Sequence, residues 1–189
     1  MNSDVLPEDR DGFRFRGGSN AIDLPATLQA RLTPSPRELL STPGDLARWL
    51  VSSGMASSAP KTTARDLASA RALREAIYVL AGGGSGANSA RRTLNQMAAG
   101  VAAVPRLRAD GTMCLEGTAG ALLVTLAREA VNLFGSDAVR QIRQCQSPTC
   151  TLYFIDNSRR GDRRWCSMSA CGNKAKVDEF RRRKRESDA

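Results

Sequence analysis

Apolar residues recur every three or four positions in several stretches of the first 137 residues, and this period predicts amphipathic helices. The longest stripe consists of Leu67, Ala70, Leu73, Ile77 and Leu80. A shorter stripe follows Thr42 and Pro43, which suit the N-cap and the first position of a helix. The expected helices span residues 43–54, 62–81, 88–99 and 118–134.

Shorter patterns predict a few strands in the same part of the chain. Within residues 13–28, alternating and then continuous apolar residues broken by two glycines predict one or two short strands. The pair Asp110-Gly111 is a turn signal, and it predicts a hairpin of residues 104–108 and 112–116. Residues 1–12 are polar, and we expect a loose arm. Residues 1–137 are therefore expected to form a mostly helical α+β domain with a small antiparallel sheet.

The pattern changes at residue 138, where a second, smaller unit begins. Residues 138–144 alternate as in a strand, and residues 151–156 predict another. In that second strand Leu152 and Phe154 face one side, and Tyr153 and Ile155 face the other. A basic loop with Gly161 at its tip follows, and a helix opens at Cys171. We expect residues 138–189 to form a small C-terminal treble-type module that ends in a helix.

Four of the five cysteines lie in this C-terminal module, with the spacing C-x4-C-x15-C-x4-C. They are Cys145, Cys150, Cys166 and Cys171. Paired cysteines a few residues apart are typical of a structural Zn²⁺ site, because one turn can aim both sulfurs at the metal and four thiolates close the tetrahedron. A four-cysteine iron–sulfur cluster, buried thiols and transient redox pairs are the alternatives. Cys114 stands alone, and we expect a small buried residue on a strand.

Length and composition are those of an ordinary globular chain. It has 189 residues, 41% of them hydrophobic, and no apolar run near the roughly 20 residues that cross a bilayer. The N-terminus lacks the apolar segment of a secretory signal, so we expect a cytoplasmic protein with no membrane partner. The histidine count is zero, which excludes Ser-His-Asp, Cys-His and HExxH chemistry.

The charge is concentrated at the C-terminal end. From residue 140 onward there are thirteen basic and six acidic residues, which accounts for most of the net charge of +9. A basic appendage on a nearly neutral body is typical of nucleic-acid binding. Charge that only aids solubility, or a tail that contacts an anionic membrane, would give the same count.

A helical wheel distributes the basic residues of the last helix over two edges. We expect nucleic acid to be contacted from one flank by Lys174, Arg181 and Arg185, from the other by Lys176 and Arg183, and from the loop by Arg159, Arg160, Arg163 and Arg164. The face of Asn173, Val177 and Phe180 is expected to pack on the zinc core. Tyr153, Phe154 and Trp165 are expected to pack around the metal rather than to stack on bases, with Arg164 on the Trp165 indole.

The run DNSRRGDRRWCSMSACGNKAK, residues 156–176, resembles the CGNR zinc-finger family of bacterial proteins. The body is similar, more loosely, to the ABATE-type domain that precedes this finger, through GGSNAIDLPATL, PGDLARWL and LASARALREAIYVL. The resemblance implies a stress-induced or ligand-responsive transcription regulator whose finger binds zinc and DNA. Lys174 replaces the arginine of the family's name, and Ala26 stands where the body motif has asparagine. Lysine keeps the charge of arginine but loses its bidentate fork.

Three classes of function remain open from the sequence. The first is a transcription regulator that binds DNA through a four-cysteine zinc module, with a body that senses a small molecule or dimerises. The second is an RNA-binding or protein-interaction module with a purely structural zinc site. An enzyme is the third, and we expect none, because the candidate polar residues have helix-surface spacing. These candidates are Asp23, Arg65, Asp66, Arg74 and Glu75.

Overall fold

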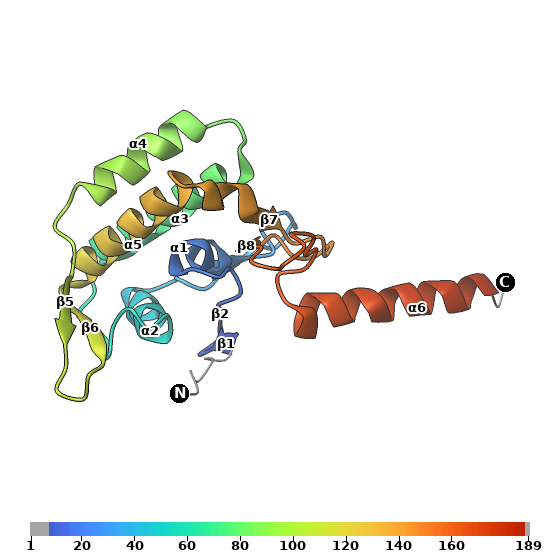
Figure 1. The fold of residues 1–189 in the computed structure, drawn as a ribbon, viewed down its shortest axis with the longest axis horizontal. Coiled ribbons are helices and arrows are strands. Elements are labelled where there is room, and N and C mark those ends of the chain that lie inside the picture. The colour runs from blue at the N-terminus through green and yellow to red at the C-terminus, as the bar shows by residue number, and fades with distance from the viewer. Residues whose placement is uncertain (1–7, 188–189) are drawn as a thin grey trace.

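A computed structural model describes residues 8–187 of the chain. Four longer helices build the body and a fifth forms the C-terminal end (Figure 1). The helices are α1 (Asn20–Asp23), α2 (Pro43–Ser52), α3 (Ala64–Gly82), α4 (Ala87–Ala98), α5 (Ala119–Phe134) and α6 (Asn173–Ser187). The strands are β1 (Asp9–Arg10), β2 (Phe13–Arg14), β3 (Leu28–Gln29), β4 (Arg37–Glu38), β5 (Val104–Leu107), β6 (Met113–Glu116), β7 (Ile142–Gln144) and β8 (Tyr153–Ile155).

The four helices predicted in the body are confirmed within two residues at each end. Thr42 and Asp45 form a capping box at the start of α2, and Thr63 and Asp66 form another at the start of α3. Gly83 ends α3 in the left-handed conformation, with φ +63°. No helix among the described residues is long and apolar enough to cross a membrane.

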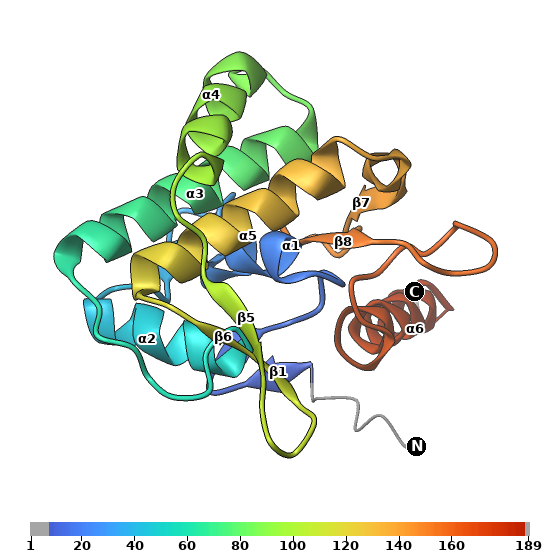
Figure 2. The ribbon, with the colours of Figure 1, turned by 60° about the vertical axis from the view of Figure 1, so that its left-hand side comes forward.

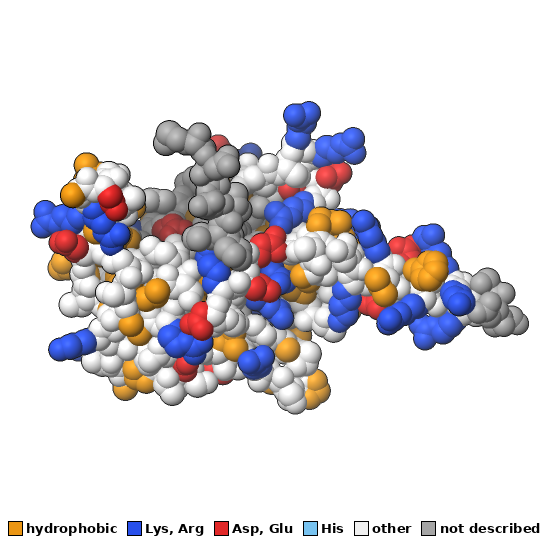
Figure 3. All heavy atoms as spheres, turned by 90° about the horizontal axis from the view of Figure 1, so that it is seen from below, with side chains coloured by type: hydrophobic (Ala, Val, Ile, Leu, Met, Phe, Trp, Pro, Cys, Tyr) orange, Lys and Arg blue, Asp and Glu red, His pale blue; other side chains and the backbone are white. Residues whose placement is uncertain are grey.

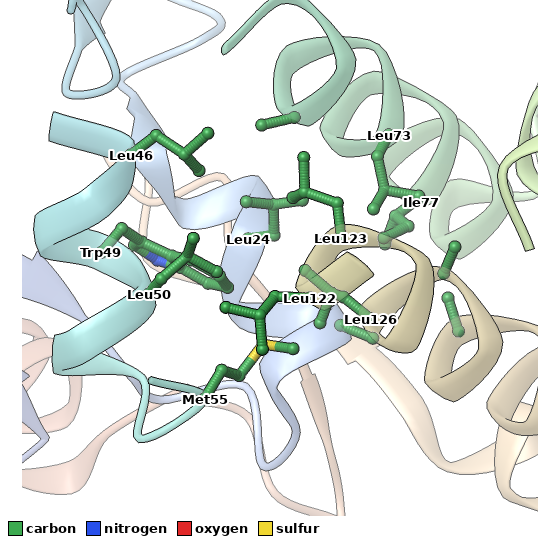
Figure 4. Close-up of a cluster of buried hydrophobic side chains, with 14 of the residues drawn as sticks. Leu24, Leu46, Trp49, Leu50, Met55, Leu73, Ile77, Leu122, Leu123 and Leu126 are labelled. Atoms are coloured by element: carbon green, nitrogen blue, oxygen red, sulfur yellow. The ribbon is translucent and has the colours of Figure 1, made fainter. Parts of the chain in front are cut away.

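One hydrophobic core lies between α2, α3, α5 and the short α1. Trp49, Leu24, Leu73 and Leu122 are among its fully buried side chains (Figure 4). Helix α4 packs on α3 and α5 from outside and gives this side of the body a second layer (Figure 2). The fold class is therefore as expected, a mostly helical body followed by a cysteine module that ends in a helix.

Within residues 8–187, the strands form four separate antiparallel pairs of two strands each. The hairpin of β5 and β6 is confirmed, with Val104 opposite Glu116 and Gly111 in the turn at φ +80°. The other pairs are β1 with β2, β3 with β4, and β7 with β8. Short pairs of this kind do not form a layer of their own, so they serve as edges and links around the helical core.

The strands expected within residues 13–28 are only partly present. Strand β2 ends at Arg14, and the apolar stretch that follows is helical, as α1 and a 3-10 turn over Leu24–Thr27. Ser19 caps α1 by accepting the N–H of Ile22. This segment is buried on nearly all sides, so its apolar residues show no helical period.

The N-terminal arm also differs from expectation. Asp9 and Arg10 form β1, which pairs with β2 through Asp9 opposite Arg14. Residues 1–7 of the expected loose arm lie outside the described residues. The β1–β2 pair borders the C-terminal module, because Ser169 of that module donates to the carboxylate of Glu8 at 3.4 Å.

Strand β8 joins the body to the C-terminal module, and its alternation is as predicted. Ile155 and Tyr153 pack with the body core, and the Tyr153 ring meets Tyr78 edge to face at 5.2 Å. Phe154 and Leu152 face the cysteines instead. The backbone N–H of Ile155 donates to the carbonyl of Gly17 at 2.8 Å. The strand predicted over 138–144 is half right, since a 3-10 turn over Asp137–Gln141 precedes β7.

Candidate metal centre

Two turns and the hairpin between them position the four cysteines. Cys145 follows β7, and its N–H donates to the carbonyl of Leu152. Cys150 ends the turn after β7, where its N–H donates to the carbonyl of Ser147. In the second pair, Cys166 lies two residues before a helical turn over Met168–Gly172, and Cys171 lies within that turn. A helical turn capped by Ser167 thus begins three residues before the predicted opening at Cys171, and α6 itself begins at Asn173.

The sulfur positions fit a tetrahedral metal. All four Sγ atoms lie within 4.8 Å of one another. The distance between the Sγ atoms of Cys150 and Cys166 is 3.8 Å, and that between Cys166 and Cys171 is 3.7 Å. Four sulfurs at about 2.3 Å from Zn²⁺ in a tetrahedron are about 3.8 Å apart. The donor set therefore has the size and shape that zinc requires, and zinc is the cofactor of this module.

The interactions among the thiol groups also favour a cation at the centre. Hydrogen bonds with Cys150 and Cys166 lower the pKa of Cys145 to about 2. The same contact raises the pKa of Cys150 to about 12, and hydrogen bonds with Cys145 and Cys150 raise the pKa of Cys166 as well. One thiolate thus suppresses ionisation of its neighbours, and a metal cation at the centre would remove this repulsion. With Zn²⁺ the centre would carry a formal charge of about −2, because its four ligands are anions.

A small apolar shell encloses the sulfurs. Cys145, Cys150 and Cys166 are buried, and Leu152, Phe154 and Ala26 close the cluster around them. Trp165 packs at its border, as predicted, and the Arg164 guanidinium lies 5.2 Å from the centre of the indole ring. Four thiolate ligands would fill the tetrahedron of Zn²⁺, which is typical of a structural zinc site.

The side chain of Arg163 bonds to backbone groups within the finger instead of extending from its surface. Its Nε donates to the carbonyl of Trp165 at 2.8 Å, and its Nη2 donates to that of Cys166. The guanidinium also lies 4.8 Å from the centre of the Phe154 ring. Asp156 fixes the basic loop by accepting the backbone N–H of Ser158 and Arg163. Arg159 and Arg160 are exposed near the loop tip, and Arg164 bonds to Gln146 at 2.7 Å.

Arg16 is a residue beside the metal centre that sequence reasoning missed. It belongs to the body, its side chain is only 8% exposed, and it interacts electrostatically with Cys166. Asp9 accepts from its Nη2 at 2.5 Å. In the sequence, only the two glycines that follow Arg16 distinguish it. Nothing there indicates that it lies near Cys166, which is 150 positions later in the chain.

Helix α6 extends away from the rest of the molecule, and its predicted packing is wrong (Figure 1). The Val177 and Phe180 side chains, expected against the zinc core, are 47% and 69% exposed. The zinc core is already closed by Leu152, Phe154 and Ala26, and the described side chains of α6 beyond its first turn are exposed. Basic and apolar side chains are interspersed over the exposed helix (Figure 3).

The basic residues of α6 differ in whether they have a partner. Arg183 pairs with Glu179, and Arg182 pairs with Glu186 at 3.1 Å. Lys174 Nζ lies 3.4 Å from the hydroxyl of Thr149. Within residues 8–187, no hydrogen bond or ion pair involves Lys176, Arg181 or Arg185. Of the two predicted edges, the one with Arg181 and Arg185 therefore keeps more available charge.

The charged residues considered as enzyme candidates make structural contacts in the body. Asp66 caps α3, and Arg65 is exposed beside it. Arg74 is buried, and its guanidinium bonds Glu38 at 2.6 Å and Glu75 at 2.7 Å. These contacts lower the pKa values of both carboxyl groups against the opposing effect of burial. The ion pairs thus hold β4 and α3 together.

Asp23 is buried, and it predicts a pH dependence of stability. Burial raises its pKa to about 7, although its Oδ1 accepts the N–H of Gly17 at 2.6 Å. Since the folded state then binds the proton more tightly than the unfolded state, the contribution of Asp23 to stability is greatest at low pH and is lost as the pH rises from about 4 to about 7. We expect a loss of up to roughly 4 kcal/mol over this range, which Asp23→Asn removes.

Urea unfolding of the zinc-loaded chain between pH 5 and 7.5 measures the part of this loss that falls above pH 5. No histidine titrates in this window, because the chain has none. Glu38 and Glu75 have lowered pKa values and stay ionised throughout. Parallel pH profiles for the wild type and Asp23→Asn would contradict the prediction.

Comparisons with known proteins identify both parts of the chain. The family model ABATE, described as "Putative stress-induced transcription regulator", matches residues 18–137, which is more than half of the chain. The model of the CGNR zinc finger matches residues 141–184. A search among curated proteins found no match. The two ranges meet between α5 and β7, where the sequence pattern changes. The chain belongs to the ABATE family, and its C-terminal part is a CGNR zinc finger.

Proposed function

We propose that this protein is a transcription regulator that binds duplex DNA through its zinc finger. Zn²⁺ is held by Cys145, Cys150, Cys166 and Cys171. The ion fixes the turn from which α6 extends, and α6 with the loop around Gly161 contacts the DNA. The protein would act in the bacterial cytoplasm, where its target lies, and the proposal assigns no reaction to the body.

The exposure of α6 is the observation that carries this proposal. The helix has 15 residues, so it is about 22 Å long, and it contains seven basic and three acidic residues. Its described side chains are exposed except for the half-buried Ala175. A free helix of this length and charge fits the major groove of B-DNA, which is about 12 Å wide.

The two edges of α6 would have different tasks in the groove. Arg181 and Arg185 lie one turn apart on one flank and would neutralise phosphates of one strand. Lys176 lies on the opposite flank, toward the other strand. Val177 and Phe180 lie between the flanks, where exposed apolar side chains can contact thymine methyl groups. The apolar surface of Val177 and Phe180, which is exposed to water in the free chain, would thus be buried in the complex.

The loop would add contacts of unequal value. Arg159 and Arg160 are exposed and able to reach a phosphate. Arg163 is bonded to carbonyl groups of the finger, and Arg183 to Glu179, so we expect both to contribute less than the sequence suggests. Lys174 keeps a positive charge at the start of α6 and suits a phosphate contact rather than bidentate recognition of guanine.

RNA binding is the second candidate, and one feature favours it. A cleft of about 580 Å³ lies between Trp165 and α6, with Arg164 and Lys176 on its walls. A single-stranded base could enter such a cleft and stack on the indole. Arg164 already covers one part of this ring, which is why we prefer duplex DNA.

Competition between nucleic acids tests the proposal. The zinc-loaded chain is given genomic DNA fragments at about 150 mM salt, and RNA of the same sequences competes. We expect the chain to enrich a shared duplex sequence that RNA does not displace. This enrichment should be lost after zinc removal. Preferential retention of RNA would overturn the proposal, and so would equal enrichment by the zinc-free chain.

We propose two further properties of the regulator. A body domain joined to a DNA-binding finger suits the sensing of a small-molecule effector. Two copies on adjacent half-sites would bind more tightly than one small finger, because the second contact becomes intramolecular. Sedimentation of the zinc-loaded chain with and without DNA distinguishes a dimer from a monomer.

A further inference from the structure

A cleft of about 440 Å³ lies where the body meets the zinc finger. Two sequence motifs that are far apart in the chain line it: the segment before α1 contributes Phe15, Arg16 and Gly18, and the segment after β8 contributes Asn157 and Ser158. Glu8, Ile155 and Arg163 complete the lining. Neither the metal centre nor the proposed DNA contacts account for this cleft.

Arg16 is the group in this cleft that most needs a ligand. Its side chain is only 8% exposed, and its Nη2 bonds Asp9. Its Nε is buried, and among the described residues it has no hydrogen-bond acceptor. The nearest carboxylate oxygen, on Glu8, is 3.7 Å away and outside hydrogen-bond distance. A buried guanidinium N–H without an acceptor is costly, so this atom is a donor left for a bound group.

Further donors and an apolar wall surround the same space. Arg163 lines the cleft with a guanidinium that uses Nε and Nη2 for the finger. Ser158 is held in place by Asp156, which accepts its N–H. Phe15 and Ile155 supply apolar surface. Glu8 is the one carboxylate among the lining residues, it is half-exposed, and Ser169 holds it toward the finger.

We propose that this cleft binds a small organic carboxylate with an apolar body. The carboxylate accepts from Arg16 Nε and from the Arg163 guanidinium, and the apolar part lies against Phe15 and Ile155. Asp9 and Glu8 balance the charge of Arg16, so the anionic ligand is favoured by the unpaired Nε donor of Arg16 together with the Arg163 guanidinium. The mixed lining favours an organic anion over an inorganic one, since the apolar wall offers nothing to phosphate.

Such a ligand would contact both parts of the chain at once. Arg16 belongs to the body, and Arg163 bonds the carbonyl groups of Trp165 and Cys166 in the finger. A bound carboxylate would therefore bridge the body and the metal centre. Any effect on DNA binding rests on the proposed function, whereas the binding site itself does not.

A titration of the zinc-loaded full chain tests the site, with benzoate and inorganic phosphate as probes. Amide NMR signals of Gly17, Gly18, Asn157 and Ser158 report binding. We expect saturable shifts of these signals with benzoate, at a dissociation constant of about 1 mM for so small a molecule. Arg16→Met should weaken binding at least tenfold, because it removes the unpaired donor. Arg92→Met, on exposed α4, should leave it unchanged.

A second variant keeps the test decisive if Arg16→Met does not fold. Asn157 is exposed and makes no side-chain hydrogen bond within the described residues, so Asn157→Trp should fold and fill the cleft. It should abolish the benzoate shifts. The proposal is overturned if benzoate causes no saturable shift, if phosphate binds and benzoate does not, or if Asn157→Trp binds benzoate as the wild type does.

Discussion

Replacing Cys166 with serine will abolish stoichiometric zinc binding and unfold the finger, while α2, α3, α4 and α5 stay folded. Cys166 is fully buried, and its Sγ lies 3.8 Å from that of Cys150 and 3.7 Å from that of Cys171. Within residues 8–187, no further cysteine or carboxylate belongs to this cluster and could take its place. Because a module of this size has a small core, binding free energy of roughly 10–16 kcal/mol for Zn²⁺ supplies most of its stability.

Zinc content and amide NMR spectra measure this outcome. The wild type should hold one zinc ion per chain, and Cys166→Ser should hold less than a tenth of that. Signals of residues 156–172 should lose their dispersion, and signals of the four body helices should keep theirs. Ile155 and Tyr153 pack with the body core, so the body should also lose some stability, by about 1–3 kcal/mol.

Cys114→Ser is the matched control, because Cys114 lies on β6 and outside the cysteine cluster. It should retain zinc and the spectrum of the finger. A Cys166→Ser chain with full zinc content would contradict the assignment. Iron and visible absorption in the purified wild type would contradict zinc and favour the iron–sulfur alternative.

The sequence was sufficient for the features that depend on local pattern. The capping boxes at Thr42 and Thr63 and the stripe along α3 fix where the helices begin and which face is buried. The spacing of the cysteines indicates the metal, because two turns of four intervening residues bring the thiols into one tetrahedron. In β8, strict alternation separates Phe154 from Ile155 and assigns each side chain to a different core.

The features that were missed depend on what lies beside a segment rather than within it. Val177 and Phe180 share a helix face, as the wheel indicates, but a wheel does not say whether another element covers that face. The apolar residues of α1 show no helical period, because α1 is buried on nearly all sides. Arg16 came to the metal centre through the fold alone, since no periodicity connects it with Cys166.

Neutralising Arg181 and Arg185 together will weaken DNA binding by about 30-fold at 150 mM salt, and will lower the salt dependence of the affinity. Six phosphate contacts predict a slope of log K against log salt of about −5, and each contact contributes about −0.9. The double variant Arg181→Gln, Arg185→Gln should therefore have a slope near −3.5. Neither residue has an ion-pair partner within residues 8–187, so each has its full charge available to a phosphate.

Fluorescence anisotropy with the duplex enriched from genomic fragments, at several salt concentrations, gives both quantities. The matched control is Arg91→Gln, Arg92→Gln, which removes two exposed charges from α4, outside the finger. Because it changes the net charge equally, it separates a local contact from a general electrostatic attraction. An equal loss of affinity in both double variants would mean that DNA binding depends on total charge alone. An unchanged slope for the α6 variant would exclude α6 from the interface, and the loop with Arg159 and Arg160 would then have to provide the contacts.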